Sequence, residues 1–248
     1  MLKQSQIDLC GRVDFTREVP LLGRQEAFSF ACAGCGNCCR GREDIVLSGL
    51  DLWRIAARLR LPPRTVARAF CKASIGQVSR LPVLRLAPVR EEGNNCPFLT
   101  ENHCAIHDAE PLVCALYPLA QEITQDGDVG YFLQPTSCGG QVISARVEDY
   151  LARYEVPARE AVDVRWAQVC MALEDRVEAL SAVFEPVFQR RMQQKLWQAL
   201  YYRYEITRPF LPQLEENLLW LDRELEKLSA LQERRNARFT KPIEKTDR

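Results

Sequence analysis

Residues 32–39 read CAGCGNCC, which places four thiols within a single short turn-forming stretch. The four are Cys32, Cys35, Cys38 and Cys39. A disulfide frame, a nucleophile or a metal site could each use cysteines at this density. The stretch overlaps two Cys-x-x-Cys turns, each of which lets two thiolates converge on one ion, and Gly34 and Gly36 ease so tight a path. The spacing therefore favours metal binding.

Cys38 and Cys39 are adjacent, and neighbouring side chains of an extended segment point in opposite directions. We therefore expect them to serve different metals, or one of them to bridge two. The alternatives are a vicinal disulfide, which is strained, and buried thiols that act as small hydrophobic side chains.

Eleven cysteines stand in a chain of 248 residues that is otherwise ordinary in composition, with 47% hydrophobic residues and balanced charge. Zero net charge gives no overall field that would attract nucleic acid or an anionic membrane. We expect a cytoplasmic location, because the sequence shows neither an apolar signal segment nor a run of about 18 apolar residues. In a reducing compartment, dense cysteine more often binds metal or does redox chemistry than forms disulfides, and an odd total fits a disulfide frame poorly.

A second group of cysteines lies in and beyond the stretch CPFLTENHCAIHDAEPLVCALYP, residues 96–118. Cys96, Cys104 and Cys114 alternate there with prolines, which hold a chain in turns rather than long regular elements. Cys138, beside two glycines, supplies a fourth thiol. We expect this half to form a preformed ligand cage.

The chain has two histidines, His103 and His107, and both fall in this second group. His103 would point away from Cys104 in an extended segment. His107 is the better candidate, either as a ligand or as a proton donor to a sulfur. A plain polar role is the alternative for each.

The order C-x-x-C-x-x-C-C, C-P-F-L, C-x-I-H and C-x-x-Y-P resembles the YkgJ-type cysteine-cluster family (CxxCxxCC), which is described as a zinc- or iron-chelating domain. The resemblance runs from about Phe28 to Gly140 and implies eight metal-binding positions. These are Cys32, Cys35, Cys38, Cys39, Cys96, Cys104, Cys114 and Cys138. The family usually has Arg-Pro before its last motif, whereas this chain has Glu110 before Pro111, so an anion replaces a cation that would steady an anionic cluster.

Three cysteines fall outside this pattern and are expected to bind no metal. They are Cys10, Cys71 and Cys170. Cys170 lies on the apolar side of a predicted helix, so we expect a buried thiol there.

Between the cysteine groups, residues 45–70 predict two helices around a short turn. Ser48 and Asp51 form a capping-box-like start, the first helix stops near Pro62, and the second runs from Pro63 or Arg64 to about Lys72. The arrangement resembles a helix-turn-helix and is locally basic, which raises a DNA-binding interpretation. A packing unit is the preferred interpretation, because the turn carries two prolines and no device for a second half-site is visible.

Short strands are expected on either side of Cys96 and Cys114. Residues 119–124 and 129–134 flank Asp126-Gly127, a hairpin turn signal, and residues 81–86 read as another strand. We therefore predict an α+β fold in which a small, irregular cysteine-rich domain is organised by metal at 28–145. Without metal its core would be thin.

The remainder predicts an all-α helical region at 146–232, preceded in the chain by an extension at 1–27 and followed by a charged, frayed tail at 233–248. Its aromatic residues are expected in the core, with an aromatic lining above the cluster as the alternative. They are Trp166, Trp197, Tyr201, Tyr202 and Tyr204.

A leucine stripe runs at heptad spacing along the last predicted helix, from Leu211 to Leu228. It is short of the three to four heptads that would make a coiled coil convincing. We expect it to dock on the preceding helices, with a homodimer as the alternative.

Together these patterns predict an iron–sulfur protein with an electron-transfer or redox role, open to oxidoreductase activity and to a redox partner or protein substrate. The alternative is a zinc- or iron-chelating protein whose zinc or mononuclear iron is structural or stored. Four thiolates suit zinc and iron–sulfur chemistry equally well. A lysine methyltransferase-like enzyme, implied only by the family's flagellin lysine-N-methylase branch, is disfavoured because no Gly-rich nucleotide loop follows a strand.

Overall fold

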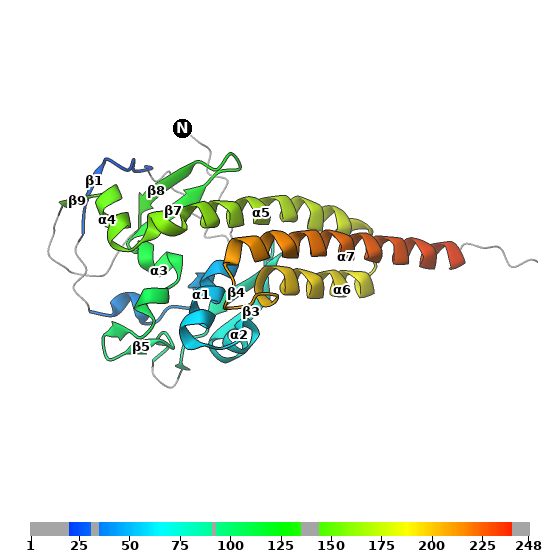
Figure 1. The fold of residues 1–248 in the computed structure, drawn as a ribbon, viewed down its shortest axis with the longest axis horizontal. Helices are drawn as coiled ribbons and strands as arrows, with labels where there is room; N and C mark the ends of the chain where they lie inside the picture. Colours follow the sequence, from blue (N-terminus) through cyan, green and yellow to red (C-terminus); the bar gives the residue numbers. More distant parts are fainter. Residues whose placement is uncertain (1–19, 31–34, 91–92, 135–143, 240–248) are drawn as a thin grey trace, which may run out of the picture.

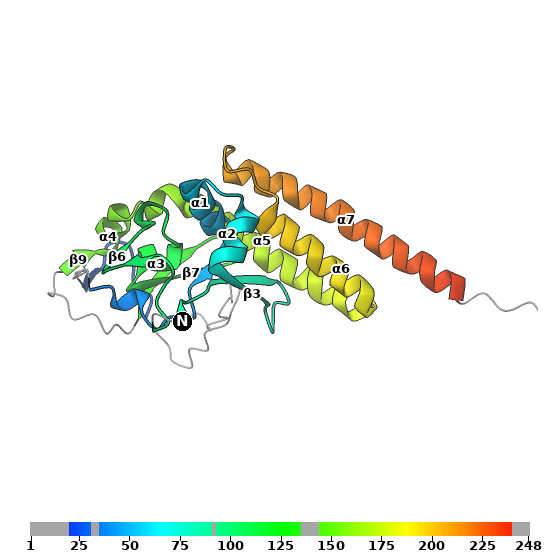
Figure 2. The same ribbon diagram turned by 90° about the horizontal axis from the view of Figure 1, so that it is seen from below.

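The three long C-terminal helices lie side by side beside the cysteine-bearing part of the chain, as Figure 1 shows. The computed structural model describes residues 20–30, 35–90, 93–134 and 144–239. In the same view, small sheets and short helices surround the cysteine segments, and the end of α7 projects past α5 and α6. Figure 2 shows the same division from below.

Seven α-helices are described. They are α1 (Gly49–Leu59), α2 (Pro63–Phe70), α3 (Leu112–Leu116), α4 (Val147–Arg153), α5 (Val156–Val183), α6 (Pro186–Trp197) and α7 (Phe210–Phe239). A π-helical turn, η4 (Gln198–Tyr202), extends α6, and two short 3₁₀ helices, η1 (Asn37–Cys39) and η3 (His107–Ala109), lie in the cysteine segments. In the part of the chain that the structure covers, no helix combines the length and apolarity needed to cross a membrane.

The strands are short and pair antiparallel. They are β1 (Ala27–Ser29), β2 (Val46–Leu47), β3 (Cys71–Ile75), β4 (Pro82–Leu86), β5 (Leu99–Thr100), β6 (His103–Cys104), β7 (Leu119–Ile123), β8 (Val129–Leu133) and β9 (Ser144–Arg146). They form a three-stranded sheet of order β2-β4-β3 and three two-stranded sheets, β1-β9, β5-β6 and β7-β8. The fold is therefore α+β, as the sequence predicts.

The helix α1 begins and ends where its local chemistry dictates. The Ser48 side chain accepts a hydrogen bond from the Asp51 amide, and the Asp51 carboxylate accepts one from the Ser48 amide, so the predicted capping box is confirmed. Gly49, the first helical residue, lets the helix approach closely, because a Cβ there would lie 2.5 Å from the Leu200 carbonyl oxygen. At the other end Arg60 adopts a left-handed conformation just before Pro62.

The hairpin and the strand expected around the cysteines are confirmed. β7 and β8 pair across the turn at Asp126-Gly127, where Gly127 has a φ of 89°, and β4 occupies the predicted strand at 81–86. One element differs from the prediction: α2 ends at Phe70, and Cys71 and Lys72 begin β3 instead. The predicted strands do not include β3, an edge strand whose burial does not alternate.

One hydrophobic core joins the cysteine-bearing part to the long helices. Leu52 and Ile55 of α1 belong to the same buried cluster as Trp166 of α5, Leu196 of α6 and Tyr201 of η4. The predicted boundary between 145 and 146 therefore does not separate two cores, because the middle of the N-terminal part packs on the C-terminal helices. A smaller cluster lies under β7, β8 and α4.

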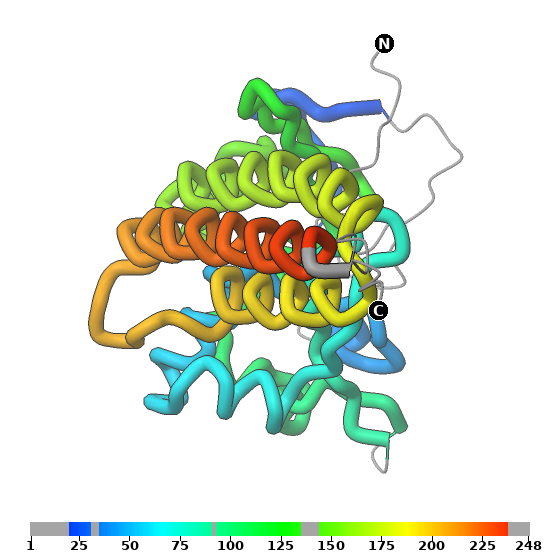
Figure 3. The backbone as a smooth tube through the Cα atoms, turned by 90° about the vertical axis from the view of Figure 1, so that its right-hand side faces the viewer, coloured from blue at the N-terminus to red at the C-terminus, as the bar shows by residue number. Residues whose placement is uncertain are grey.

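The long helices pack through the leucine stripe of α7. In Figure 3 this helix lies between α5 and α6. Leu214, Leu221, Leu225 and Leu228 are buried within the chain, in agreement with the docking interpretation. α7 also continues to Phe239, beyond residue 233 where we expected a frayed tail, and ion pairs such as Lys195–Glu224 link its upstream half to the neighbouring helices.

Candidate metal centre

The thiols are carried by three short elements, the first of which is far from the other two in sequence. η1 carries Cys38 and Cys39, the β5–β6 hairpin carries Cys104 with Cys96 just before it, and α3 carries Cys114. The amide of Cys96 donates to the carbonyl oxygen of Cys39 at 2.7 Å, which ties the first group of cysteines directly to the second. The fold therefore brings together segments that the sequence separates.

These elements surround a cavity of about 300 Å³. Six of the eight predicted ligands line it. They are Cys35, Cys38, Cys39, Cys96, Cys104 and Cys114. His103, His107 and Glu110 line it as well. The donor set is thus mostly soft sulfur, which suits zinc and iron.

The other cysteines divide as follows. Cys32 and Cys138 lie outside the described residues, as does Cys10. Cys71, in β3, and Cys170, buried in α5, are not among the residues that line the cavity. The burial predicted for Cys170 is confirmed by its exposure of 3%.

The geometry of Cys38 and Cys39 differs from the expectation for an extended segment. Because the two residues lie in a 3₁₀ helix that follows Gly36 at a φ of 67°, their sulfur atoms are 3.9 Å apart on the same side. That separation is far beyond a disulfide bond. It is close to the ~3.8 Å that a tetrahedron with Zn–S bonds of about 2.3 Å requires between sulfurs. The pair therefore has the spacing of two ligands on one ion.

Backbone amides are directed at two of the sulfurs. The backbone at Phe98 and Leu99 acts to lower the pKa of the Cys96 thiol, and the backbone at Ile106 acts to lower that of the Cys104 thiol. Such donors stabilise the thiolate, the form that binds metal. Both arise from the turns on either side of the β5–β6 hairpin, so this local backbone already has the conformation that a thiolate ligand needs.

Burial dominates the protonation of the thiols. It raises the pKa of Cys96, raises that of Cys104 to about 11 and raises that of Cys114 well above its ordinary value, and neighbouring thiols add to each effect. The pKa of Cys38 is also raised, first by its hydrogen bond with Cys39 and then by burial. These thiols hold their protons at neutral pH, and a bound metal cation would release them.

The thiols converge on the cavity without closing on a common point. Over residues 20–30, 35–90, 93–134 and 144–239, no three His, Cys, Asp or Glu side chains are close enough together to hold a metal ion. The chemistry of the donor set nevertheless fits such an ion, because six half-buried cysteines from three elements line one cavity.

Two arginines next to the first cysteine group were not anticipated from the sequence. Arg40 donates to the Cys35 carbonyl oxygen at 2.6 Å and to the Asn102 side chain at 2.6 Å. It therefore links the first cysteine turn to the β5–β6 hairpin. Arg42 lines the cavity and binds both carboxylate oxygens of Asp44. Both arginines directly follow the C-x-x-C-x-x-C-C motif in the sequence. This position is the only feature of the sequence from which their role could have been predicted.

His107 and Glu110 form a pair at the cavity wall, with 3.3 Å between the His107 Nδ1 and a Glu110 carboxylate oxygen. The His107 side chain is 67% exposed, whereas that of Glu110 is 14% exposed. Burial raises the pKa of Glu110, while His107 acts in the opposite direction. His107 therefore lines the same cavity as the thiols, and its Nδ1 atom is paired with the Glu110 carboxylate.

Aromatic residues that the sequence patterns do not predict also line the cavity. Phe30, Tyr117, Tyr150 and Tyr154 line the space opposite the hairpin, and the Tyr150 hydroxyl donates to the Tyr117 carbonyl oxygen. Among the aromatic residues of the later helices, Trp166, Tyr201 and Tyr204 are buried in the core, as expected, and the alternative of a lining above the cluster does not apply to them. Tyr150 and Tyr154 come from around α4, far from any cysteine motif in sequence.

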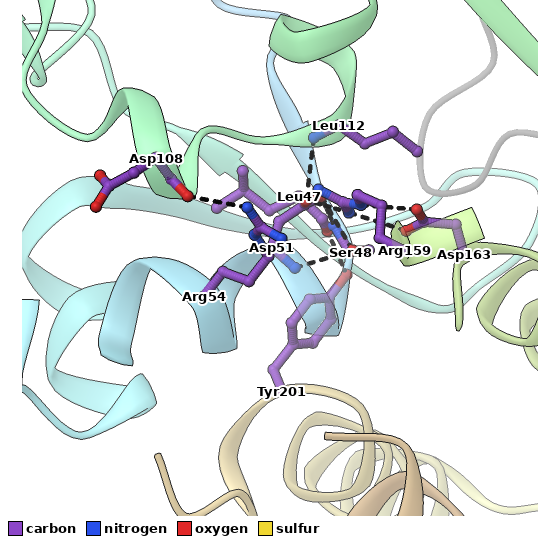
Figure 4. A network of polar contacts seen from close by, with 9 residues as sticks. All are labelled: Leu47, Ser48, Asp51, Arg54, Asp108, Leu112, Arg159, Asp163 and Tyr201. Atoms are coloured by element: carbon purple, nitrogen blue, oxygen red, sulfur yellow. Dashed lines mark hydrogen bonds and ion pairs between the residues drawn. The ribbon is translucent and has the colours of Figure 1, made fainter. Parts of the chain in front are cut away.

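A buried polar network holds α3, and with it Cys114, in place (Figure 4). Asp51 of α1 accepts hydrogen bonds from the Leu112 amide at 3.0 Å and from Arg159 of α5 at 2.6 Å. Arg159 also binds Asp163, and all three charged side chains are at most 5% exposed. One carboxylate therefore links the start of the cysteine-bearing helix to both α1 and α5.

A further contact secures the preceding turn. Arg54 donates to the carbonyl oxygen of Asp108, and Arg58 binds the Asp108 carboxylate. These two arginines of the predicted basic helix pair are therefore engaged with the cysteine segment, which supports the interpretation of α1 and α2 as a packing unit.

Residues 31–138 match the model of the family CxxCxxCC, described as "Putative zinc- or iron-chelating domain". The match spans both cysteine groups and agrees with the resemblance drawn from the motifs. No curated protein and no solved structure was found to match the chain. The family match supports metal binding and leaves zinc and iron equally open.

Proposed function

We propose that the protein holds iron as an iron–sulfur centre through its cysteine cluster and uses it for electron transfer or a redox reaction. The observation that carries the proposal is the convergence of six thiols, from three separate segments, on one cavity. Iron–sulfur clusters are held by cysteine thiolates, and their potentials depend on hydrogen bonds to sulfur and on solvent exposure.

The size of the cavity supports a cluster over a single ion. A tetrahedral zinc ion sits within about 2.3 Å of its sulfurs and needs little further space. The cavity of about 300 Å³ is large by comparison, and apolar side chains such as Ile45, Phe98 and Ile106 line much of it. An apolar lining excludes water and so helps to set the potential of a bound centre.

In this proposal, the chain's own residues supply ligands, hydrogen bonds and a dry surrounding. Cys38, Cys96, Cys104 and Cys114 lie close enough to influence one another electrostatically, and Cys39 influences Cys38 in the same way, so these five are the best candidates for one shared set. The amides of Phe98 and Ile106 would stabilise sulfur charge. A cluster, once bound, would supply one-electron chemistry. A protein redox partner and a location in the reducing cytoplasm follow as expectations.

A zinc- or iron-chelating protein with a structural or stored single ion is the second candidate. The 3.9 Å spacing of the Cys38 and Cys39 sulfurs favours it, because that spacing fits two ligands of one tetrahedral ion. The two candidates share ligands and differ in whether inorganic sulfide and more than one metal are present.

The test is to purify the protein without oxygen, record its visible absorption and assay iron, sulfide and zinc in one sample. The proposal expects a brown protein with iron and sulfide in similar amounts, whose colour bleaches on reduction. A colourless protein with stoichiometric zinc and no sulfide would eliminate the cluster in favour of the second candidate. The preparation must be anaerobic, because oxygen can strip iron and let zinc replace it.

A further inference from the structure

Two charged side chains, Arg42 and Glu110, face the thiols across the cavity. We propose that they set the stability of the bound metal–thiolate centre in opposite directions: Arg42 stabilises it and Glu110 opposes it. The inference rests on the metal binding of the proposed function but not on which metal is bound.

Arg42 lines the cavity and forms an ion pair with Asp44, which is the more exposed of the two side chains. Its Nε and Nη2 atoms donate to the two carboxylate oxygens of Asp44 at 2.5 and 2.9 Å. The Asp44 side chain is 60% exposed, whereas that of Arg42 is 28% exposed. Water therefore screens the carboxylate more than the guanidinium.

Arg42 lies close to several thiols at once. It lines the main cavity, and it also lines a small adjoining one together with Cys38, Cys39, Cys96 and Cys114. Among the described residues that line the main cavity, it is the single arginine or lysine. Its neighbour Arg40 is engaged instead in hydrogen bonds that tie two loops together.

Glu110 presents the opposite charge from the other side. Its side chain is 14% exposed, lies just before the helix that carries Cys114, and influences Cys104 and Cys114 electrostatically. Its partner His107 is 67% exposed and compensates the carboxylate only when it is protonated. Glu110 therefore adds negative charge to the space in which thiolates would form.

The sign of each effect follows from the charge of the centre. Thiols are neutral when protonated, and a metal ion held by four thiolates carries a net negative charge. A nearby cation stabilises that state and a nearby anion destabilises it, and both effects are strong in a partly buried site. At effective dielectric constants near 20, one such charge is expected to change the dissociation constant about tenfold.

The experiment measures zinc affinity of the metal-free protein, prepared without oxygen, by competition with a chromophoric chelator. Arg42→Gln should weaken zinc binding and Glu110→Gln should tighten it, each by about tenfold. Arg165→Gln and Glu215→Gln are the matched controls, because they break an equally bidentate ion pair between α5 and α7 that does not line the cavity. Both controls should bind zinc as the wild type does.

Arg42→Lys separates charge from structure. Lysine keeps the positive charge but cannot bind both carboxylate oxygens of Asp44. The variant should therefore retain most of the wild-type zinc affinity if the positive charge stabilises the centre. Equal loss in Arg42→Lys and Arg42→Gln, or shifts of the same sign in Arg42→Gln and Glu110→Gln, would overturn the inference while leaving metal binding intact. Wild-type protein that binds neither zinc nor iron would overturn the metal binding itself, and the inference with it.

Discussion

At the scale of single residues, the cysteines divide by position rather than by burial. Cys71 and Cys96 are both half-buried, and burial raises the pKa of both thiols, to about 12 for Cys71. They differ in that Cys96 lines the cavity, beside other thiols and below two backbone amides. A comparison of these two residues therefore isolates the effect of the site.

We predict that Cys96→Ser, Cys104→Ser and Cys114→Ser each lower the metal content of anaerobically purified protein markedly, whereas Cys71→Ser does not. Serine keeps the size of the side chain but lacks a soft thiolate. The measurement is metal per protein by elemental analysis, with Cys170→Ser as a buried control. Equal metal loss in Cys71→Ser and Cys96→Ser would show that the grouping of the cysteines is wrong.

The sequence predicted these residues better than it predicted their surroundings. Cysteine spacing is a local signal, so the order of residues alone is enough to name the ligand candidates. Arg42, Tyr150 and Tyr154 carry no spacing signature, and two of them reach the cavity only because α4 returns to it. The opposite orientation expected for Cys38 and Cys39 failed because a 3₁₀ helix, not an extended segment, carries them.

At the scale of elements, the buried carboxylate of Asp51 is the main link between α1, α3 and α5. It caps α1, accepts from the Leu112 amide and pairs with Arg159 in a site shielded from water. Without Asp51, Asp163 would still pair with Arg159, but the Ser48 and Leu112 amides would lose their acceptor and one hydrogen bond of Arg159 would be lost.

We predict that Asp51→Ala lowers the free energy of unfolding by about 2–4 kcal/mol, because it removes a helix cap and leaves buried donors without an acceptor. Asp222→Ala is the control, since it removes a carboxylate from an ion pair with Arg176 in which both side chains are at least 36% exposed. It should cost about 0–1 kcal/mol. Urea unfolding followed by circular dichroism measures both, and losses that agree within error would contradict the role assigned to Asp51.

An acid-sensitive contact joins α6 to α7. Hydrogen bonds from Lys195 and Lys227 lower the pKa of Glu224 from its ordinary value of 4.5 to about 2. A carboxylate whose pKa is lower in the folded state adds stability above the unfolded pKa and loses it as pH falls. The contribution is therefore complete above about pH 4.5 and disappears toward pH 2.

We predict that Glu224→Gln removes this contribution to the pH dependence of the free energy of unfolding. Its melting temperature should be lower than that of the wild type at pH 6 and should approach the wild-type value near pH 2.5. The difference at pH 6 is modest, about 1 kcal/mol at most, because the lysines are partly exposed and solvent screens the pair. A difference that stays constant from pH 6 to pH 2.5 would exclude the assigned titration.

Element-level prediction succeeded where the signal is local. The capping box of α1 and the Asp126-Gly127 turn each depend on a few neighbouring residues, and both are present in the structure. The continuation of α7 to Phe239 was not predicted, because its charged sequence resembles a solvated tail. Contacts such as Gln232 to the backbone around α5 and α6 anchor this half of the helix and come from distant parts of the chain.

At the scale of the whole molecule, the cysteine-bearing part is not independent of the helices. Leu52, Ile55 and Val66 share a core with Trp166 and Tyr201, whereas the β5–β6 hairpin and η1 lie outside the long helices and contribute few buried hydrophobic residues. The sequence suggested a boundary near 145 because the cysteines and turns end there and apolar residues at helical spacing begin. Composition does not reveal that α1 and α2 pack across it.

We therefore predict that metal removal loosens only part of the N-terminal region. After chelation, hydrogen exchange should accelerate in peptides that cover residues 96–117 and stay unchanged in α1, whose apolar face is buried against the helices. Mass spectrometry of deuterium uptake measures both. Equal acceleration in α1 would indicate instead that metal organises the whole stretch 28–145.

The central claim is that the cavity thiols hold a metal centre. X-ray absorption at the iron and zinc edges of anaerobically purified protein tests it most directly, because the spectrum reports both the metal and the atoms bound to it. An iron–sulfur centre in the cavity should give an iron edge with sulfur in the first shell and a second shell from neighbouring iron. A first shell of nitrogen and oxygen at either edge, with no sulfur, would contradict it.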